Sequence, residues 1–177
     1  KGDWEPRCPF CNESLKPMGT TEMDQQMCNS IYAINKKDQE DMIMVFGRAY
    51  KLPTVALRYF NVYGPRQNPD GAYALVVGKF MKQISRGEKM TITGTGKQTR
   101  DFPSVHDIVR ANMLAMKSKK VGRGEVINIG AGRNQSIVRI ADLIGGEKTF
   151  VPARFEPAHT LADNSLAKHL LGWTPRV

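Results

Sequence analysis

Apolar residues recur along this chain at the spacings of short helices and strands. Residues 31–50 carry apolar positions at helical spacing in their later turns, and Asn29 and Ser30 before them are residue types that cap a helix N-terminus. The run TVALRYF, residues 54–60, is apolar and lies between turn residues, which indicates a buried strand. Further helices are expected at 72–86, 107–117, 137–145 and 164–173, and further strands at 90–94, 125–130 and 148–152. Strands that alternate with helices are typical of the α/β class.

Three segments lack such periodicity and are expected to be loops. Residues 1–29 are rich in Pro, Cys, Met and polar types, and we interpret them as a loop or an insertion. Residues 61–71, NVYGPRQNPDG, are dense in turn-forming residues, and residues 93–102, TGTGKQTRDF, form the third loop.

Composition narrows the class of protein. The 177 residues are 41% hydrophobic, which suffices for a domain with a core, and no apolar run reaches the roughly 18 residues of a membrane span. The net charge of +9 is scattered along the chain, which favours a solvated surface over a nucleic-acid site. Three cysteines, an odd number, fit the reducing cytoplasm. We therefore expect a cytoplasmic protein without a nucleic-acid or membrane partner.

Tyr32 and Lys36 form the first candidate catalytic pair. Residues four apart lie on one face of a helix. An unperturbed tyrosine, with a pKa of about 10, is a poor base at neutral pH, but a nearby ammonium favours the phenolate. Such a pair can take a proton from an alcohol while a hydride leaves its carbon. The alternative is an aromatic ring packed on a lysine stem, and the spacing alone does not decide between them.

The segments that follow resemble a known family. The series PTVALRYFNVYGPRQNP, GKQTRDFPSVHDIVRANMLAM, EVINIGAGRNQSIVRIADLI and VPARFEPAHTLADNSLAKHLLGWTPRV occurs in the order found in extended short-chain dehydrogenases/reductases. Within that superfamily the chain resembles NAD-dependent nucleotide-sugar epimerases and dehydratases, in particular the UDP-glucose 4-epimerase type. The resemblance covers residues 30–177 and implies the C-terminal part of a Rossmann-type fold plus the small substrate-binding domain.

The resemblance also implies roles for individual residues. Tyr32 would be the catalytic base, and Lys36 would hold the nicotinamide ribose of NAD. Tyr59 and Phe60 would lie beside the nicotinamide. Three further residues would bind a nucleotide-diphosphate sugar: Asn61, Arg100 and Arg154. A guanidinium suits phosphate oxygens because it is permanently charged and forked.

The resemblance implies domain limits and a missing part. Residues 30–65 would end the NAD-binding domain, and 66–177 would be mostly substrate domain with segments that return to the sheet. The glycine-rich loop that opens such enzymes does not occur; Gly130-Ala131-Gly132 is its nearest substitute and belongs to the substrate half of the family. We therefore expect a fragment that binds NAD weakly and is inactive alone, with an open sheet edge and a homodimer interface on the Tyr–Lys helix.

The reaction remains open at this point. A 4-epimerase acting through a 4-keto sugar and a 4,6-dehydratase share these motifs, and a non-catalytic zinc-binding or interaction module is an alternative of another class. The last alternative depends on Cys8 and Cys11, whose Cys-x-x-Cys spacing supplies two of the four ligands of a structural zinc site. The resemblance places a cysteine-containing insertion of some bacterial epimerases here, with a second pair upstream. A plain loop with reduced cysteines is the other interpretation.

Overall fold

The structure of the chain is a computed structural model that describes residues 7–71, 74–154 and 156–177. Its elements alternate between helix and strand, which confirms the α/β class. They are α1 Ile31–Tyr50, β1 Thr54–Tyr59, α2 Val76–Ser85, β2 Met90–Thr93, β3 Thr99–Asp101, α3 Val105–Lys117, β4 Arg123–Ile129, β5 Asn134–Ser136, α4 Ile137–Ile144, β6 Lys148–Val151 and α5 Ser165–Leu171. No helix in the described ranges is long and apolar enough to cross a bilayer.

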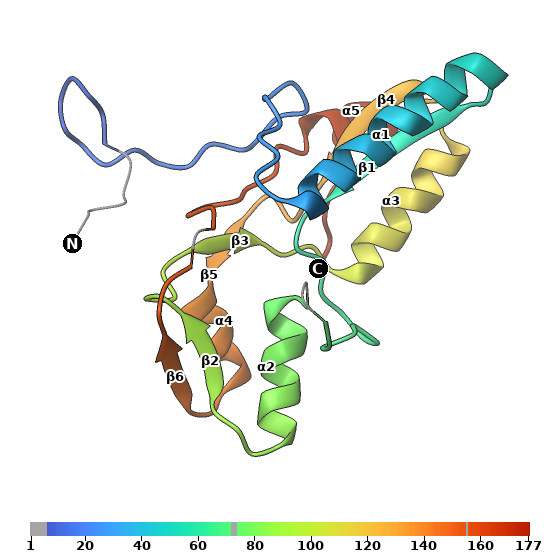
Figure 1. Cartoon of the computed structure of the whole chain (residues 1–177). Helices are drawn as coiled ribbons and strands as arrows, with labels where there is room; N and C mark the ends of the chain where they lie inside the picture. Colours follow the sequence, from blue (N-terminus) through green and yellow to red (C-terminus); the bar gives the residue numbers. More distant parts are fainter. Residues whose placement is uncertain (1–6, 72–73, 155) are drawn as a thin grey trace.

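Two bodies make up the molecule, joined through β3 and β5 (Figure 1). The β1–β4 body contains the parallel pair β1 and β4 together with α1, α3 and α5. The β2–β6 body contains the parallel pair β2 and β6 together with α2 and α4. Between them β3 pairs antiparallel with β5. Figure 1 shows the first part of the described segment before α1 as an irregular trace that extends away from both bodies. Residues 20–22 lie against the β1–β4 body, where the N–H of Thr20 donates to the carbonyl of Leu161 and Glu22 Oε1 accepts from the N–H of Asn128.

Each body has its own apolar core. In the β1–β4 body, Ile127 and Ile129 of β4 are fully buried against α3, α5 and Trp173. Because side chains alternate along a strand, Asn128 and the paired Arg58 of β1 point to the other face, where Arg58 contacts α1 and Asn128 contacts Thr20 in the segment before α1. In the β2–β6 body, Phe80 of α2, the two β2 residues Met90 and Ile92, and α4 form the second core.

The junction between the bodies is polar and is centred on Asp101, the last residue of β3. The side chain is fully buried, and its carboxylate accepts hydrogen bonds from three backbone N–H groups, those of Ala131, Gly132 and Ala162. Burial raises the pKa of Asp101 above its ordinary value, and the three amide donors oppose that shift. The carboxylate thus ties β3 to the loop after β4 and to the segment before α5.

The periodic segments are where the sequence predicts them, but strand β1, expected to be buried, is only partly buried and ends at the exposed Tyr59. Residues 99–101, expected in a loop, and residues 134–136, for which no strand was expected, both form strands, because three residues are too few to show a period of two. Helix α3 begins at Val105 instead of 107, since the Ser104 side chain caps it by accepting from the N–H of His106. Helix α2 begins at Val76 instead of 72; residues 72 and 73 lie outside the described residues.

Replacing Asp101 with asparagine is expected to lower the free energy of unfolding by about 2 kcal/mol, because an amide Nδ2 would face backbone N–H groups that now have an acceptor. Urea unfolding followed by circular dichroism measures this. Asp142→Asn is the matched control, since Asp142 pairs with Lys148 at a partly exposed site and the variant should unfold almost as the wild type does. An unchanged midpoint for Asp101→Asn would contradict the role given to this carboxylate.

Candidate functional site

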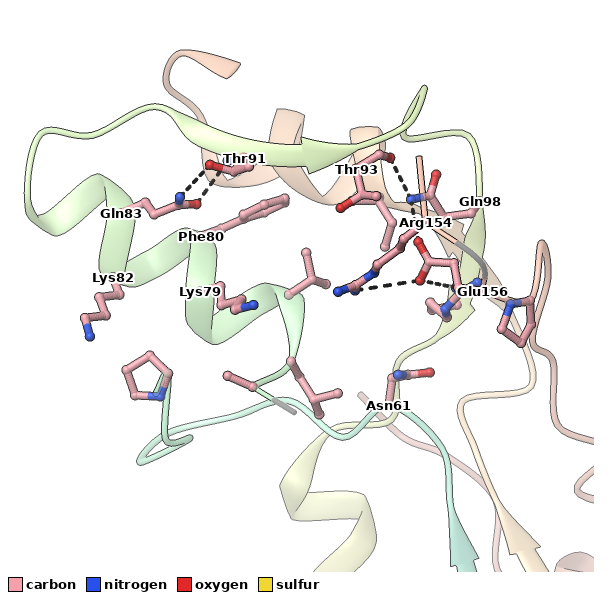
Figure 2. Close-up of a pocket in the computed structure, with 17 residues that line it drawn as sticks. Asn61, Lys79, Phe80, Lys82, Gln83, Thr91, Thr93, Gln98, Arg154 and Glu156 are labelled. Atoms are coloured by element: carbon pink, nitrogen blue, oxygen red, sulfur yellow. Dashed lines mark hydrogen bonds and ion pairs between the residues drawn. The ribbon is translucent and has the colours of Figure 1, made fainter. Parts of the chain in front are cut away.

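A hollow of about 870 Å³ lies between α2 and the strands β2 and β3 (Figure 2). Its wall contains Asn61, Arg100 and Arg154, the three residues that the sequence predicts to bind a nucleotide-diphosphate sugar. They come from three separate segments: Asn61 follows β1, Arg100 lies in β3, and Arg154 follows β6. The fold therefore brings this predicted set together, while their role as ligands of a diphosphate stays a prediction.

The hollow is positively charged. Its lining includes four cationic side chains, Lys79, Lys82, Arg100 and Arg154, and one carboxylate, that of Glu156. Lys82 is paired with Asp70. The ammonium of Lys79 is exposed and has no hydrogen-bond or ion-pair partner among the residues that the structure describes. Such a lining suits an anionic ligand.

Arg100 is the most buried of these cations. Its Nη1 donates to the carbonyl oxygens of Thr99, at 2.8 Å, and Ala158, at 3.4 Å. Its Nη2 donates to Oε2 of Glu156 at 2.9 Å. Glu156 is not among the residues predicted from the sequence; its signal there is an acidic residue two positions after Arg154.

Tyr32 and Lys36 lie near the N-terminus of α1, on one face of the helix. The Ser30 side chain caps the helix by accepting from the N–H of Ala33 at 3.1 Å. The Lys36 ammonium is 5.7 Å from the centre of the Tyr32 ring, and it also donates to Gln39 Oε1 at 3.2 Å. Tyr32 is about half exposed, and neither residue lines the hollow. The pair and the hollow are therefore separate features of the described structure.

Tyr59 and Phe60 end β1. The Tyr59 hydroxyl donates to Asn112 Oδ1 on α3 at 2.8 Å, and the N–H of Phe60 donates to the carbonyl of Ile129 at 3.2 Å, which prolongs the β1–β4 pairing. Asn61 follows at once, and its N–H donates to the carbonyl of Asp101 at 3.0 Å. The end of β1 is thus fixed to both β4 and β3.

A bidentate ion pair anchors the Tyr–Lys helix to the sheet. Arg58 of β1 donates through Nε and Nη2 to the two carboxylate oxygens of Glu40 on α1, at 2.8 and 2.7 Å. Its Nη1 also donates to the carbonyl of Glu22, at 3.2 Å. Hydrogen bonding to Arg58 is the main cause that lowers the pKa of Glu40 below its ordinary value. The sequence does not predict this pair, because nothing in it matches residues 18 positions apart.

The two cysteines of the Cys-x-x-Cys lie in a tight hairpin. The N–H of Asn12 donates to the carbonyl of Cys8 at 2.8 Å, the N–H of Cys8 donates to the carbonyl of Glu13 at 2.9 Å, and Asn12 has a left-handed φ of 60°. Backbone N–H groups of Cys11 and Phe10 lower the pKa of the Cys8 thiol. The described residues contain no cluster of three or more metal-ligating side chains. The zinc site stays a prediction, which the zinc content of the purified protein addresses.

The Epimerase family model, described as the NAD dependent epimerase/dehydratase family, matches residues 13–130. The chain therefore belongs to this family, and the resemblance found in the sequence is confirmed. A curated relative, "Uncharacterized UDP-glucose epimerase YtcB" of Bacillus subtilis (strain 168), is 35% identical over 171 residues, 93% of this chain and 49% of the relative. A dTDP-D-glucose 4,6-dehydratase of Bos taurus is 36% identical over 110 residues, 62% of this chain and 29% of the relative.

Solved structures show the same fold. UDP-glucose 4-epimerase from Thermotoga maritima, with UDP-glucose, has a TM-score of 0.82 and 38% identity over 93% of this chain and 54% of that chain. UDP-glucuronic acid 4-epimerase from Bacillus cereus, in complex with UDP-glucuronic acid and NAD, has a TM-score of 0.80 and 35% identity over 92% of this chain and 52% of that chain. The chain spans about half the length of the curated epimerases it matches.

The Arg58–Glu40 pair is expected to stabilise the protein only when Glu40 is ionised. Because the pKa of Glu40 is lowered in the folded state, its contribution is present above the ordinary value of 4.5 and is lost as the pH falls through the lowered value. Glu40→Gln should therefore cost about 1 kcal/mol at pH 7, and the difference from the wild type should vanish in acid.

Urea unfolding at a series of pH values checks this expectation. Asp41→Asn is the matched control on the same helix, because its pair with Lys37 is exposed and should contribute less at any pH. A difference between Glu40→Gln and the wild type that stays constant from neutral to acid pH would show that ionisation of Glu40 does not carry the effect.

Proposed function

We propose that the chain carries the substrate site and the catalytic Tyr–Lys helix of an NAD-dependent epimerase. The enzyme would act on a nucleoside-diphosphate sugar and invert carbon 4 of the sugar through a 4-keto intermediate. The observation that carries the proposal is the convergence of Asn61, Arg100 and Arg154 on one cationic hollow. Among the relatives are UDP-glucose and UDP-glucuronate epimerases, which supports a UDP-sugar as the substrate class.

Tyr32 is proposed as the proton acceptor. Its phenolic oxygen, deprotonated for this role, would take the proton of the sugar 4-hydroxyl group and later return it. The Lys36 ammonium lies 5.7 Å from the centre of the Tyr32 ring, on the same face of α1. NAD, when bound, supplies the hydride acceptor and donor. Tyr59 and Phe60 would border the nicotinamide, as the family resemblance implies. The structure holds this end of β1 to α3 and β4 through the Tyr59 hydroxyl and the Phe60 N–H.

The described residues fit only one end of the cofactor. Gly130-Ala131-Gly132 follows a strand, as a pyrophosphate-binding loop does, but its N–H groups are already used: that of Gly130 donates to Asn164 Oδ1, and those of Ala131 and Gly132 donate to Asp101. This loop therefore offers no donors to a pyrophosphate. The interpretation that it belongs to the substrate half is supported, and the phosphates of NAD would be held elsewhere.

A 4,6-dehydratase of the same family is the alternative reaction. It would use the same site for the first oxidation, and the bovine dehydratase relative is as similar over its matched segment as the epimerase relatives are. Epimerisation is proposed first because UDP-glucose epimerases are among the relatives that cover most of this chain, 93% and 84% of it. Product analysis of the enzyme with UDP-sugars and dTDP-glucose separates the two.

Arg154→Gln is expected to weaken binding of UDP to this chain about tenfold, because it removes an exposed guanidinium from the hollow. Isothermal titration calorimetry measures the affinity. Two controls should bind UDP as the wild type does: Arg48→Gln on the far part of α1, and Tyr32→Phe, since Tyr32 lies outside the hollow. In the enzyme with its NAD-binding part, Tyr32→Phe should instead abolish turnover. Equal UDP affinity for Arg154→Gln and the wild type would refute the placement of the diphosphate.

A homodimer through α1 is part of the proposal. Met42, Val45, Phe46 and Tyr50 recur at helical spacing on α1, and each is at least half exposed. An exposed apolar stripe on a helix is typical of a contact with another helix, and a second copy of α1 offers the matching surface. We expect Phe46→Glu to lower the average mass measured by sedimentation, while Lys51→Glu at the end of the helix should not. A wild-type chain that sediments as a monomer at every concentration would contradict the dimer.

A further inference from the structure

Glu156 forms an ion pair with Arg100, the most buried cation of the hollow. Of the five N–H donors of the Arg100 guanidinium, two point to the carbonyl oxygens of Thr99 and Ala158, and one donates to Glu156 Oε2 at 2.9 Å. The Arg100 side chain is only 10% exposed. Few donors of Arg100 are therefore left for a ligand while Glu156 is in place.

The Glu156 carboxylate also faces the second arginine. Nη2 of Arg154 lies 3.9 Å from the same oxygen, Oε2, and Nε2 of Gln98 donates to the other oxygen at 3.3 Å. Figure 2 shows Arg154, Gln98 and Glu156 gathered at one side of the hollow. Glu156 is thus an anion already seated between the two guanidinium groups that were predicted to hold a diphosphate.

We propose that Glu156 is an internal competing anion that the phosphates of the ligand must displace from Arg100. It keeps Arg100 paired while the hollow is empty, and an unpaired buried charge would be costly. It also lowers the affinity for every ligand that needs Arg100, which favours release of product. The inference rests on the proposed function for the identity of the ligand, but the competition itself concerns any phosphate-containing anion.

Exposure makes this exchange feasible. The Glu156 side chain is 23% exposed and that of Arg154 is 69% exposed, so the carboxylate has a path into solvent. Two linked phosphates carry enough negative charge to replace one carboxylate between two arginines. If Glu156 occupies Arg100 for nine-tenths of the time, the apparent affinity for a displacing ligand falls about tenfold.

The test compares Glu156→Gln with the wild type in calorimetric titrations at low salt, with inorganic pyrophosphate, UDP and uridine as probes. Pyrophosphate and UDP should bind Glu156→Gln about tenfold more tightly, and the affinity for uridine, which has no phosphate, should not change. Glu147→Gln is the matched control, since Glu147 pairs with the exposed Lys89 outside the hollow and should leave all three affinities unchanged.

A second variant tests whether the length of the side chain at position 156 matters as well as its charge. Glu156→Asp keeps the negative charge but withdraws it by one methylene group from Arg100, so pyrophosphate should bind with an affinity between those of the wild type and Glu156→Gln. Pyrophosphate should also raise the melting temperature of Glu156→Gln more than that of the wild type, which checks that the variant is folded.

The outcomes distinguish this inference from the proposed function. Unchanged or weaker binding of pyrophosphate to Glu156→Gln overturns the inference even where UDP binds the wild type well. A parallel loss of UDP and uridine affinity in Glu156→Gln also overturns it, because Glu156 would then contact the nucleoside. Tighter pyrophosphate binding by the variant, with no UDP binding by either protein, supports the inference and refutes the proposed nucleotide ligand.

Discussion

The carboxylate of Asp101 joins the segments that meet at the centre of the molecule. It accepts from the N–H groups of Ala131, Gly132 and Ala162, while the Asp101 carbonyl accepts from the N–H of Asn61. Hydrogen bonds to Asp101 of β3 therefore hold three segments in place: the loop after β4, the segment before α5 and the end of β1. Because side chains alternate along a strand, fixing Asp101 on one side of β3 directs the neighbouring Arg100 to the other, into the hollow.

The candidate site spans two bodies, and neither apolar core reaches across it. Asn61 belongs to the end of β1, whereas Arg100 and Arg154 flank the β2–β6 body. A polar contact at the junction sets their relation, because the carbonyl of Asp101, next to Arg100, accepts from the N–H of Asn61. Hydrogen bonds and ion pairs are directional, so they fix orientations that apolar packing alone leaves loose.

Local periodicity was enough to predict most of the helices and strands, and spacing was enough to place Tyr32 beside Lys36. The same reasoning could not find β3 and β5, which are held by a buried carboxylate and a partner strand more than 30 residues away. The ion pairs Arg58–Glu40 and Arg100–Glu156 could not be predicted either, because each forms only in the tertiary fold. Family resemblance selected Asn61, Arg100 and Arg154, and the fold explains why residues so far apart in the chain line one hollow.

Carboxylates of the chain itself fill two positions suited to an anion: Asp101 at the loop Gly130-Ala131-Gly132, and Glu156 between the two arginines. A Cβ on Gly130 would lie 2.4 Å from Cβ of Ala162 and 2.7 Å from Asp101 Oδ2, so this glycine permits a close approach of the backbone to an anion. The anion is a carboxylate of the chain itself rather than a pyrophosphate. Asp101 is fully buried and makes a permanent tie, whereas Glu156 is partly exposed and seated between arginines. The difference in exposure is what makes the first carboxylate part of the scaffold and leaves the second exchangeable with a ligand.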